Sequence, residues 1–451
     1  MRLPLRGALV AGVCSRLRRG LSTAASRPQW AIVNGTGLLV NSTSRRATLQ
    51  LAEHPRFSEL LVPSHLINPL PRINSDLESV GLFGGMVCAT SGDGLLLLEF
   101  RDGPATPAFA AKVRAARESQ SRTVTVSGNT HDIDPDITRF VCNPLSGEIF
   151  RLPDIDGTKK VRGHHAKGIL TQSVRGHGPP DRYAVVELSM EGEGDKGTFV
   201  MRRFFSETRV WDKMVGLPSL LPRPRRIDMD LEVVAFAGRL WWVDDLTWGA
   251  VSADPFSEQP ELRFVELPRA SVRPVPGPGK NEIPVQGMHR RMGVSEGKLR
   301  YVEVSQRQPF VLSSYALDDD GDCWRLEHQV ALSPLLADAG TQEGTPQIGV
   351  INPLNAHAYV IHNYDESWRL STRNRALVID MYTRKVLASS LMTDVPANPV
   401  AAACFSSLLK ACVLPPWLGT TRIPYAGTLS GNIKSKTLPD VLVRVDRDAE
   451  N

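Results

Sequence analysis

Short polar turns that join two strand-like runs recur along this 451-residue chain, and their spacing limits the folds that it can adopt. The clearest copy runs from Phe140 to Pro153. Six such turns are anchored at Ser91, Asn143, Ser206, Asp254, Asp318 and Asp380, so the successive gaps are 52, 63, 48, 64 and 62 residues by subtraction. Paired strands with a period of about fifty residues are typical of β-propeller blades. We therefore predict an all-β propeller of about six or seven blades, in which the anchors mark successive blades.

Further strand-like runs complete the predicted blades. Four of them precede anchor hairpins and are expected to supply inner strands: 183–188, 240–244, 299–304 and 358–361. Asn34-Gly35 favours a reverse turn, so Trp30–Val40 is expected to form a first hairpin. We expect Val441–Val445 to close the ring against that hairpin. One short, alanine-rich helix is expected at Ala108–Ser119.

The first 27 residues differ in character from the rest of the chain. They contain six arginines and no acidic residue, and leucine or valine recurs at every fourth position from Leu5 to Leu21. An arginine-rich, acid-poor amphipathic start is typical of an organellar transit peptide. The run Arg19-Gly20-Leu21-Ser22 resembles a matrix-peptidase site, which makes Leu21 and Ser22 the candidate cleavage residues. We expect a mitochondrial transit peptide over 1–27, with plastid or cytosolic localisation as alternatives, and a propeller-like body over 28–451.

Charge and hydropathy restrict the partners of this body. The whole chain carries a formal charge of +5, and removal of the six leader arginines leaves 5 − 6 = −1. A near-neutral body disfavours nucleic-acid binding, which normally requires a basic surface. The longest apolar run, Val400–Leu414, is interrupted by Ser406, Ser407 and Lys410, and a membrane-spanning helix needs about eighteen apolar residues. No transmembrane segment is therefore predicted.

The cysteines do not suggest a disulfide framework or a zinc site. The chain has six, with no Cys-x-x-Cys pair, and one of them, Cys14, lies in the leader. The five that remain in the body are an odd number and are scattered on apolar strands, which predicts buried free thiols in a reducing compartment.

One block of sequence resembles a known family. It comprises Gly238–Asp244, Trp248-Gly249, Asp254–Phe256 and Leu262–Pro268, and continues through Gly297–Val302 and Cys323–Leu326. This pattern, over roughly residues 230–370, resembles the plant domain of unknown function 1618 family. The resemblance implies a propeller-like body of unassigned activity and no catalytic residues. The hairpins are also similar in style to F-box-associated propellers, but no F-box helices precede them.

Three short motifs invite a chemical interpretation, and each is better explained as a turn or loop. Gly293–Gly297 matches the Gly-x-Ser-x-Gly pattern of a nucleophile elbow, but a strand and not a helix is expected after it. We therefore expect Ser295 to be an exposed turn residue. Asp318–Asp322 has its glycine misplaced for a calcium-binding EF-hand loop, which favours a hairpin turn. His131–Asp136 directly precedes a strand and is expected to be a solvated loop.

Other candidate residues also have structural explanations. Trp241 and Trp242 are adjacent in an expected strand, so they must point to opposite faces, and we expect both to pack between blades. His164, His165 and His177 lie in glycine-rich, basic runs typical of surface loops.

These observations favour a non-enzymatic interaction scaffold whose protein partner binds a loop face of the propeller. The alternative is a hydrolase-like propeller enzyme with its site in the central channel. A cluster of at least three ionisable side chains converging in that channel would favour the enzyme. The sequence predicts no cofactor, no metal site and no catalytic residue, and leaves the binding residues unassigned.

Overall fold

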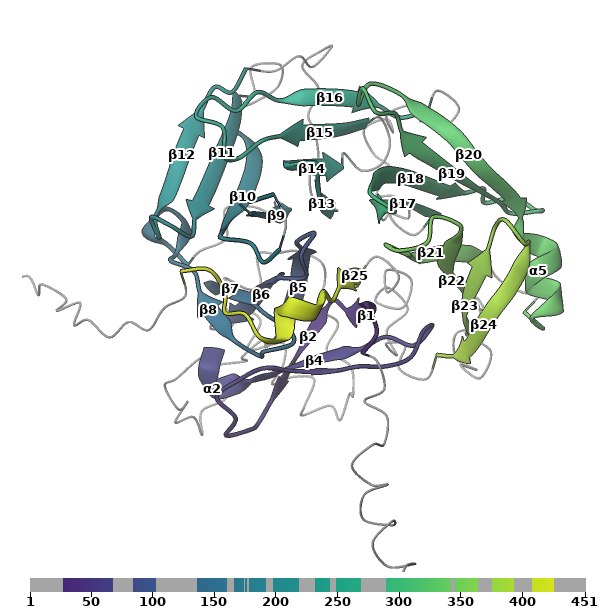
Figure 1. Cartoon of the computed structure of the whole chain (residues 1–451), viewed down its shortest axis with the longest axis horizontal. Coiled ribbons are helices and arrows are strands. Elements are labelled where there is room, and N and C mark those ends of the chain that lie inside the picture. The colour runs from purple at the N-terminus through teal and green to yellow at the C-terminus, as the bar shows by residue number, and fades with distance from the viewer. Residues whose placement is uncertain are drawn as a thin grey trace, which may run out of the picture.

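The computed structural model describes residues 27–67, 84–102, 136–159, 166–173, 175–176, 178–191, 198–218, 232–243, 249–268, 289–341, 345–363, 375–392 and 408–425. Within these residues the strands form six blades around a common centre, which confirms the predicted all-β propeller (Figure 1). The expected helix at Ala108–Ser119, the strand at Val441–Val445 and the leader up to residue 26 lie outside the described residues.

Five blades each contain four antiparallel strands that follow one another in sequence; four of them are separate sheets, and blade 1 is one end of a seven-stranded sheet. Blade 1 consists of β5 (Gly84–Thr90), β6 (Leu96–Asp102), β7 (Asp136–Cys142) and β8 (Ile149–Arg151). Blade 2 consists of β9 (Lys167–Gln172), β10 (Arg182–Glu191), β11 (Thr198–Phe205) and β12 (Trp211–Val215). Blade 3 consists of β13 (Glu232–Phe236), β14 (Arg239–Val243), β15 (Gly249–Ala253) and β16 (Arg263–Glu266).

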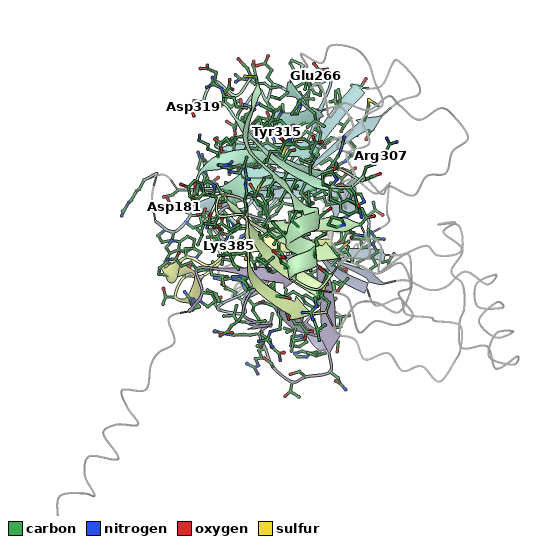
Figure 2. All side chains as sticks on the ribbon, turned by 90° about the vertical axis from the view of Figure 1, so that its right-hand side faces the viewer. Asp181, Glu266, Arg307, Tyr315, Asp319 and Lys385 are labelled. Atoms are coloured by element: carbon green, nitrogen blue, oxygen red, sulfur yellow. The ribbon has the colours of Figure 1, made fainter. Side chains whose placement is uncertain are left out.

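Blades 4 and 5 repeat this pattern. Blade 4 consists of β17 (Arg290–Ser295), β18 (Lys298–Val304), β19 (Val311–Leu317) and β20 (Trp324–Ala331). Blade 5 consists of β21 (Pro346–Ile351), β22 (Ala358–Asn363), β23 (Arg375–Asp380) and β24 (Lys385–Leu391), and α5 (Leu332–Asp338) connects the two blades. The first strands of neighbouring blades contact one another at the centre, whereas β20 and β24 lie at the outer rim (Figures 1 and 2). The inner strands expected from sequence are therefore the second strands of blades 2 to 5, one place out from the centre.

The two ends of the described chain build the sixth blade together. β25 (Leu409–Val413) pairs antiparallel with β1 (Trp30–Asn34), with Trp30 opposite Val413. A parallel bridge joins Val33 of β1 to Ser58, the residue before β4 (Glu59–Pro63), and β4 pairs with β3 (Thr48–Gln50). β2 (Thr36–Val40) pairs with β4 and with β5, which joins the sixth blade to blade 1. Two short helical turns, α2 (Ser64–Ile67) and Pro416–Gly419, follow β4 and β25.

The expected hairpin at Trp30–Val40 is therefore wrong. β1 and β2 do not pair with each other: β1 pairs with β25, whereas β2 pairs with β4 and β5. The Asn34-Gly35 turn is real, because Asn34 Oδ1 accepts hydrogen bonds from the Thr36 N–H at 3.1 Å and the Thr36 hydroxyl at 2.8 Å. A side-chain cap of this kind redirects the chain without requiring the flanking strands to pair. Within the described residues, the strand that pairs with β1 is β25, and the expected closing strand Val441–Val445 lies outside them.

Five of the six sequence anchors mark the same place in five blades. Asn143, Ser206, Asp254 and Asp318 each directly follow the third strand of a blade, and Asp380 is the last residue of such a strand. The side-chain oxygen holds the turn: Asp380 Oδ1, for example, accepts the Tyr382 N–H at 2.8 Å and the Thr383 N–H at 3.2 Å. Ser91 differs, because it joins β5 to β6 within the blade that Asn143 also belongs to. The assumption that all the anchors mark successive blades is thus wrong at Ser91.

Tryptophans of β14 fill the interfaces on both sides of blade 3. Trp242 is fully buried among residues of blades 2 and 3, while Trp241 packs with residues of blades 3 and 4 such as Met292 and Tyr301. Each indole N–H donates to a backbone carbonyl, Trp242 to Ala166 and Trp241 to Phe236, both at 3.3 Å. The predicted packing of both faces is confirmed.

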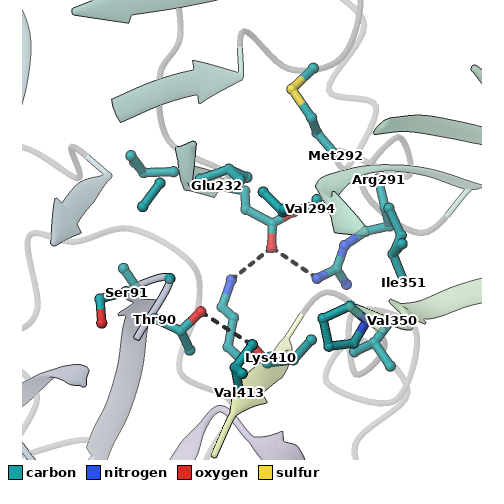
Figure 3. A pocket seen from close by; sticks show the side chains of 18 residues that line it. Thr90, Ser91, Glu232, Arg291, Met292, Val294, Val350, Ile351, Lys410 and Val413 are labelled. Carbon is teal, nitrogen blue, oxygen red and sulfur yellow. Dashed lines mark hydrogen bonds and ion pairs between the residues drawn. The ribbon is translucent and has the colours of Figure 1, made fainter. Parts of the chain in front are cut away.

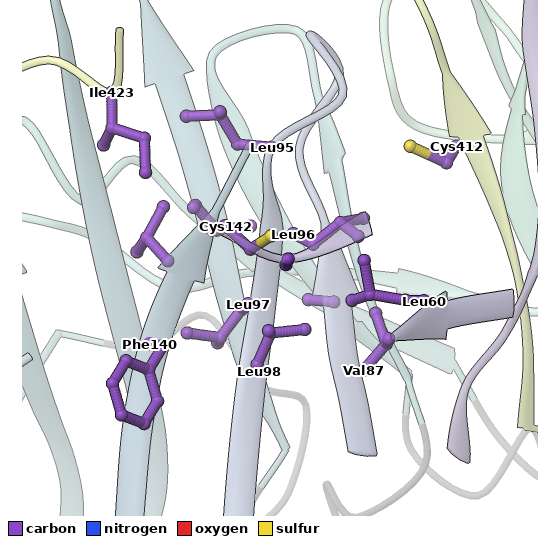
Figure 4. Packing of buried hydrophobic residues seen from close by; sticks show 14 of the residues in the cluster. Leu60, Val87, Leu95, Leu96, Leu97, Leu98, Phe140, Cys142, Cys412 and Ile423 are labelled. Carbon is purple, nitrogen blue, oxygen red and sulfur yellow. The ribbon is translucent and has the colours of Figure 1, made fainter. Parts of the chain in front are cut away.

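A further apolar cluster joins the two ends of the described chain. Leu60 of β4, Leu96 and Leu98 of β6, Cys412 of β25 and Ile423 contribute to one buried group (Figure 4). This packing ties the sixth blade to blade 1. Cys88, Cys142, Cys323 and Cys412 are all free thiols, but Cys323 is exposed and Cys88 is only partly buried, whereas all were expected to be buried. No helix in the described part of the chain is long and apolar enough to cross a membrane.

Candidate functional site

The central channel contains a cavity of about 170 Å³. Its lining comes from the first strands of five blades: β5, β13, β17, β21 and β25. Most of the lining is aliphatic, including Val294, Ile351 and Val413, and its ionisable residues are Glu232, Arg291 and Lys410 (Figure 3). The channel is thus an apolar chamber with one charged group of residues.

These three side chains form one ion-paired triad. Glu232 Oε1 accepts a hydrogen bond from Arg291 Nη2 at 2.9 Å and from Lys410 Nζ at 3.3 Å. Arg291 lies on the blade next to that of Glu232, and Lys410 lies on β25 of the sixth blade, on the other side of the channel (Figure 3). The triad therefore links the composite sixth blade to blades 3 and 4 through the centre of the ring.

Arg291 is held in place by backbone contacts. Its Nη1 donates to the carbonyl of Gly349 at 2.9 Å, and its Nη2 also donates to the carbonyl of Leu409 at 3.0 Å. Lys410 has fewer contacts: among the described residues its ammonium group donates to Glu232 alone, although it can donate three hydrogen bonds. Glu232 Oε2 likewise has no hydrogen-bond partner among the residues that the structure describes. Lys410 and Glu232 thus retain polar capacity that faces the cavity.

The environment fixes the charge states in the channel. Burial alone would raise the pKa of Glu232, but the positive charges of Arg291 and Lys410 outweigh it and lower that pKa. Glu232 is therefore ionised near neutral pH. Behind the triad, burial and then the charge of Arg291 lower the pKa of His362 to about 3, which keeps its imidazole neutral. The cavity lining carries two cations and one carboxylate, an excess of one positive charge.

A second charged network lies between blades 1 and 2. Lys167 Nζ contacts Glu99 Oε2 at 3.4 Å and Glu187 Oε2 at 3.3 Å, and Arg139 also pairs with Glu99 at 3.4 Å. All four side chains are at most 10% exposed. Lys167 and Arg139 lower the pKa of Glu99 against the opposing effect of burial. Burial raises the pKa of neighbouring Cys88 to about 12, so its thiol stays protonated and is a weak nucleophile.

The outer rim offers a different kind of site. A groove of about 260 Å³ lies between blade 5 and the sixth blade. Blade 5 contributes Ser390 and Leu391, and the sixth blade contributes Leu51 and Phe57. Leu387 and Leu391 of β24 are 56% and 51% exposed beside it. This rim therefore presents apolar side chains to solvent.

The structure also places the motifs singled out in the sequence. Gly293–Gly297 joins β17 to β18, which confirms the hairpin over the nucleophile elbow. Ser295 is nevertheless fully buried, and its hydroxyl donates to the Asn352 carbonyl at 2.6 Å, so the expectation of an exposed serine is wrong. Asp318–Asp322 forms the turn between β19 and β20, with Asp318 Oδ1 accepting the Asp322 N–H at 2.9 Å.

Several other sequence candidates lie outside the described residues. They are the cleavage residues Leu21 and Ser22, the three loop histidines 164, 165 and 177, residues 131–135, and Trp248. Within the described residues, no group of three or more His, Cys, Asp or Glu side chains could hold a metal ion.

Sequence reasoning missed the channel triad. Lys410 was noted only as an interruption of an apolar run, and Glu232 and Arg291 were not singled out. The sequence feature that could have indicated the triad is a charged residue at or near the start of each of the strands β13, β17 and β25, which line the centre. That signal could not be interpreted before the innermost strands were known.

Comparisons with known proteins support the family resemblance. Residues 242–365 match the family described as "Protein of unknown function (DUF1618)", which confirms the resemblance over that part of the chain. Among curated proteins, none matches this chain.

Solved structures give weaker likenesses. The periplasmic gluconolactonase PpgL of Pseudomonas aeruginosa is 10% identical, with 86% of this chain and 99% of that chain covered and a TM-score of 0.32. A DUF4623 family protein from Bacteroides eggerthii is 12% identical, with 79% of this chain and 76% of that chain covered and a TM-score of 0.31. Apo AztD from Citrobacter koseri is 11% identical, with 58% of this chain and 70% of that chain covered and a TM-score of 0.27. TM-scores this low assign neither a fold nor an activity to this chain.

Proposed function

We propose that this protein is a non-enzymatic interaction scaffold that binds an extended segment of a partner protein along β24. The observation that carries the proposal is an uncharged edge at the rim. β24 has the sequence Lys-Val-Leu-Ala-Ser-Ser-Leu, with no charge after Lys385, and it ends its sheet without a further strand among the described residues. Open edges of this kind can accept a strand from another chain.

Three of the other outermost strands of the sequential blades carry both an acidic and a basic residue. β12 contains Asp212 and Lys213, β16 contains Arg263 and Glu266, and β20 contains Arg325 and Glu327. Charges on an edge strand discourage pairing with another chain. β24 carries a charge only at its first residue, Lys385, and exposes Leu387, Leu391 and, in the preceding turn, Tyr382, which is 77% exposed. The uncharged run after Lys385 on an exposed edge strand supports a docking role.

Paired variants test this function. Leu387→Lys combined with Leu391→Lys adds charge to β24, whereas Leu326→Lys on β20 changes a leucine whose exposure, 51%, equals that of Leu391. Proteins that co-purify with the wild-type chain should be lost with the β24 variant and retained with the β20 variant. Amide exchange at residues 385–391 should slow in the purified complex. Partners that bind both variants equally, or no slowing at β24, would contradict the proposal.

The alternative function is a hydrolase-like enzyme with its site in the central channel, and the convergence of Glu232, Arg291 and Lys410 favours it. The lowered pKa of Glu232, however, leaves it far from the near-neutral pKa that suits a general acid or base. The hydroxyls in the lining belong to Thr90 and Ser91, and Thr90 Oγ1 donates to the Ala411 carbonyl at 3.2 Å. These features support binding in the channel more than turnover.

We further propose that the protein acts in mitochondria after removal of a transit peptide. The arginine-rich, acid-free start and the run Arg19-Gly20-Leu21-Ser22 support this localisation. N-terminal sequencing of the endogenous protein should begin between Ser22 and Trp30. Protein with an intact Met1 in organelle-free cytosol would contradict it.

A further inference from the structure

The channel cavity has chemical features that a protein-docking role does not require. Its lining combines aliphatic side chains with one positive charge in excess. Within that lining, Arg291 and Lys410 both donate to the single oxygen Oε1 of Glu232. Lys410 is a buried cation that shares its carboxylate with Arg291, and such a cation favours the binding of an anion.

We propose that the channel binds a small hydroxycarboxylate anion, with its carboxylate on Lys410 and its hydroxyl on Glu232. Lys410 Nζ makes one hydrogen bond within the described residues, to Glu232 at 3.3 Å, which leaves donors for a carboxylate. An ionised carboxylate can only accept hydrogen bonds, so Oε2 of Glu232 requires a donor on the ligand, such as a hydroxyl group. The same pair of groups therefore selects a ligand that presents an anion and a donor side by side.

The size and the rest of the lining limit the ligand further. A cavity of about 170 Å³ holds roughly five or six waters at liquid density, so it admits a ligand of about six or seven non-hydrogen atoms. Val294, Ile351 and Val413 offer aliphatic contacts for a short carbon chain (Figure 3). Arg291, anchored by the carbonyls of Gly349 and Leu409, orients Glu232.

Three probes of similar size test the proposal by titration calorimetry on the full chain at constant ionic strength. 3-Hydroxybutyrate carries both features, butyrate lacks the hydroxyl, and butyramide lacks the charge. We expect 3-hydroxybutyrate to bind more tightly than butyrate, and butyramide to bind at least about tenfold more weakly than butyrate. Equal binding of the two acids would overturn the role of Glu232. Binding of butyramide as tight as that of 3-hydroxybutyrate, or no binding of any probe, would overturn the site.

Two variants locate the binding. Lys410→Met removes the ammonium group and keeps a side chain of similar length, and its control is Lys385→Met on the exposed outer strand. Val413→Phe fills the cavity and leaves the triad unchanged, so it serves if Lys410→Met fails to fold. Loss of 3-hydroxybutyrate binding in Lys410→Met or Val413→Phe, with binding retained in Lys385→Met, is the expected result. Unchanged binding in a folded Val413→Phe protein would place the anion elsewhere and overturn the proposal. The readout involves no protein partner, so it is independent of docking at β24.

Discussion

At the scale of single residues, burial and hydrogen bonding decide what each side chain contributes. The adjacent indoles of Trp241 and Trp242 could be assigned from sequence, because strand geometry alone sends them to opposite faces. Ser295 could not, since its partner is the carbonyl of Asn352, in the neighbouring blade. Ser295 is buried because the neighbouring blade packs over its turn, and the local sequence does not encode which residues pack there.

Trp241→Ala should destabilise the fold by about 3–5 kcal/mol, because it removes a large side chain from the packed interface of blades 3 and 4. Ser295→Ala should cost roughly 1 kcal/mol, since one buried hydrogen bond to Asn352 is lost. Val210→Ala, at an exposed site, is the control and should change stability by less than about 0.5 kcal/mol. Denaturant melts measure all three. A Trp241→Ala midpoint equal to that of the control would contradict the packing described here.

Glu232 should make stability depend on pH in the acid range. Its pKa is lowered in the folded state, so the unfolded chain binds more protons and stability rises with pH. Glu232→Gln should lower stability by roughly 1–3 kcal/mol at pH 7, since an ionised hydrogen-bond partner is lost. That difference from wild type should shrink as the pH falls below about 4.3, the usual pKa of glutamate, as the wild-type carboxylate becomes protonated. A difference that stays constant from pH 7 to pH 3 would show that the triad contributes nothing.

At the scale of elements, the sequence predicted what is local and missed what is not. The hairpins at Asn143, Asp254, Asp318 and Asp380 are local, because an Asn or Asp side chain caps the N–H groups of its own turn. The pairing of β1 with β25 joins residues 30–34 to residues 409–413, and no turn signal encodes such a pair. Glu232, Arg291 and Lys410 were missed for the same reason, since the packing of blades and the closure of the ring, and not a local turn, bring their strands together.

Asn143 is the anchor with the largest structural role. Its Oδ1 caps the Leu145 and Ser146 N–H groups, and its Nδ2 donates to the carbonyls of Leu418 and Thr421 at 2.8 and 3.2 Å. Asn143→Ala should cost about 1–3 kcal/mol, because those buried groups lose their partner. Asp318→Ala, which affects only an exposed turn, should cost less. Thermal melts compare the two variants, and an equal loss in both would argue against a link between blade 1 and the segment after β25.

At the scale of the whole molecule, the central feature is a six-bladed ring whose last blade comes from both ends of the described chain. Three contacts close the ring: the pairing of β1 with β25, the apolar cluster around Leu60 and Cys412, and the ion pair between Lys410 and Glu232. Removing β25 should therefore leave β1 without its partner and open the ring. Removing residues beyond Tyr425 leaves every one of these contacts in place.

Two truncations measured side by side test this closure most directly. A chain ending at Tyr425 should remain monomeric and melt cooperatively like the full-length protein. A chain ending at residue 407 lacks β25, so it should lose the cooperative melt and aggregate through exposed strand edges, as gel filtration with light scattering would report. If the chain ending at residue 407 stays monomeric and melts like full-length protein, the ring is not closed by β25 and the account is wrong.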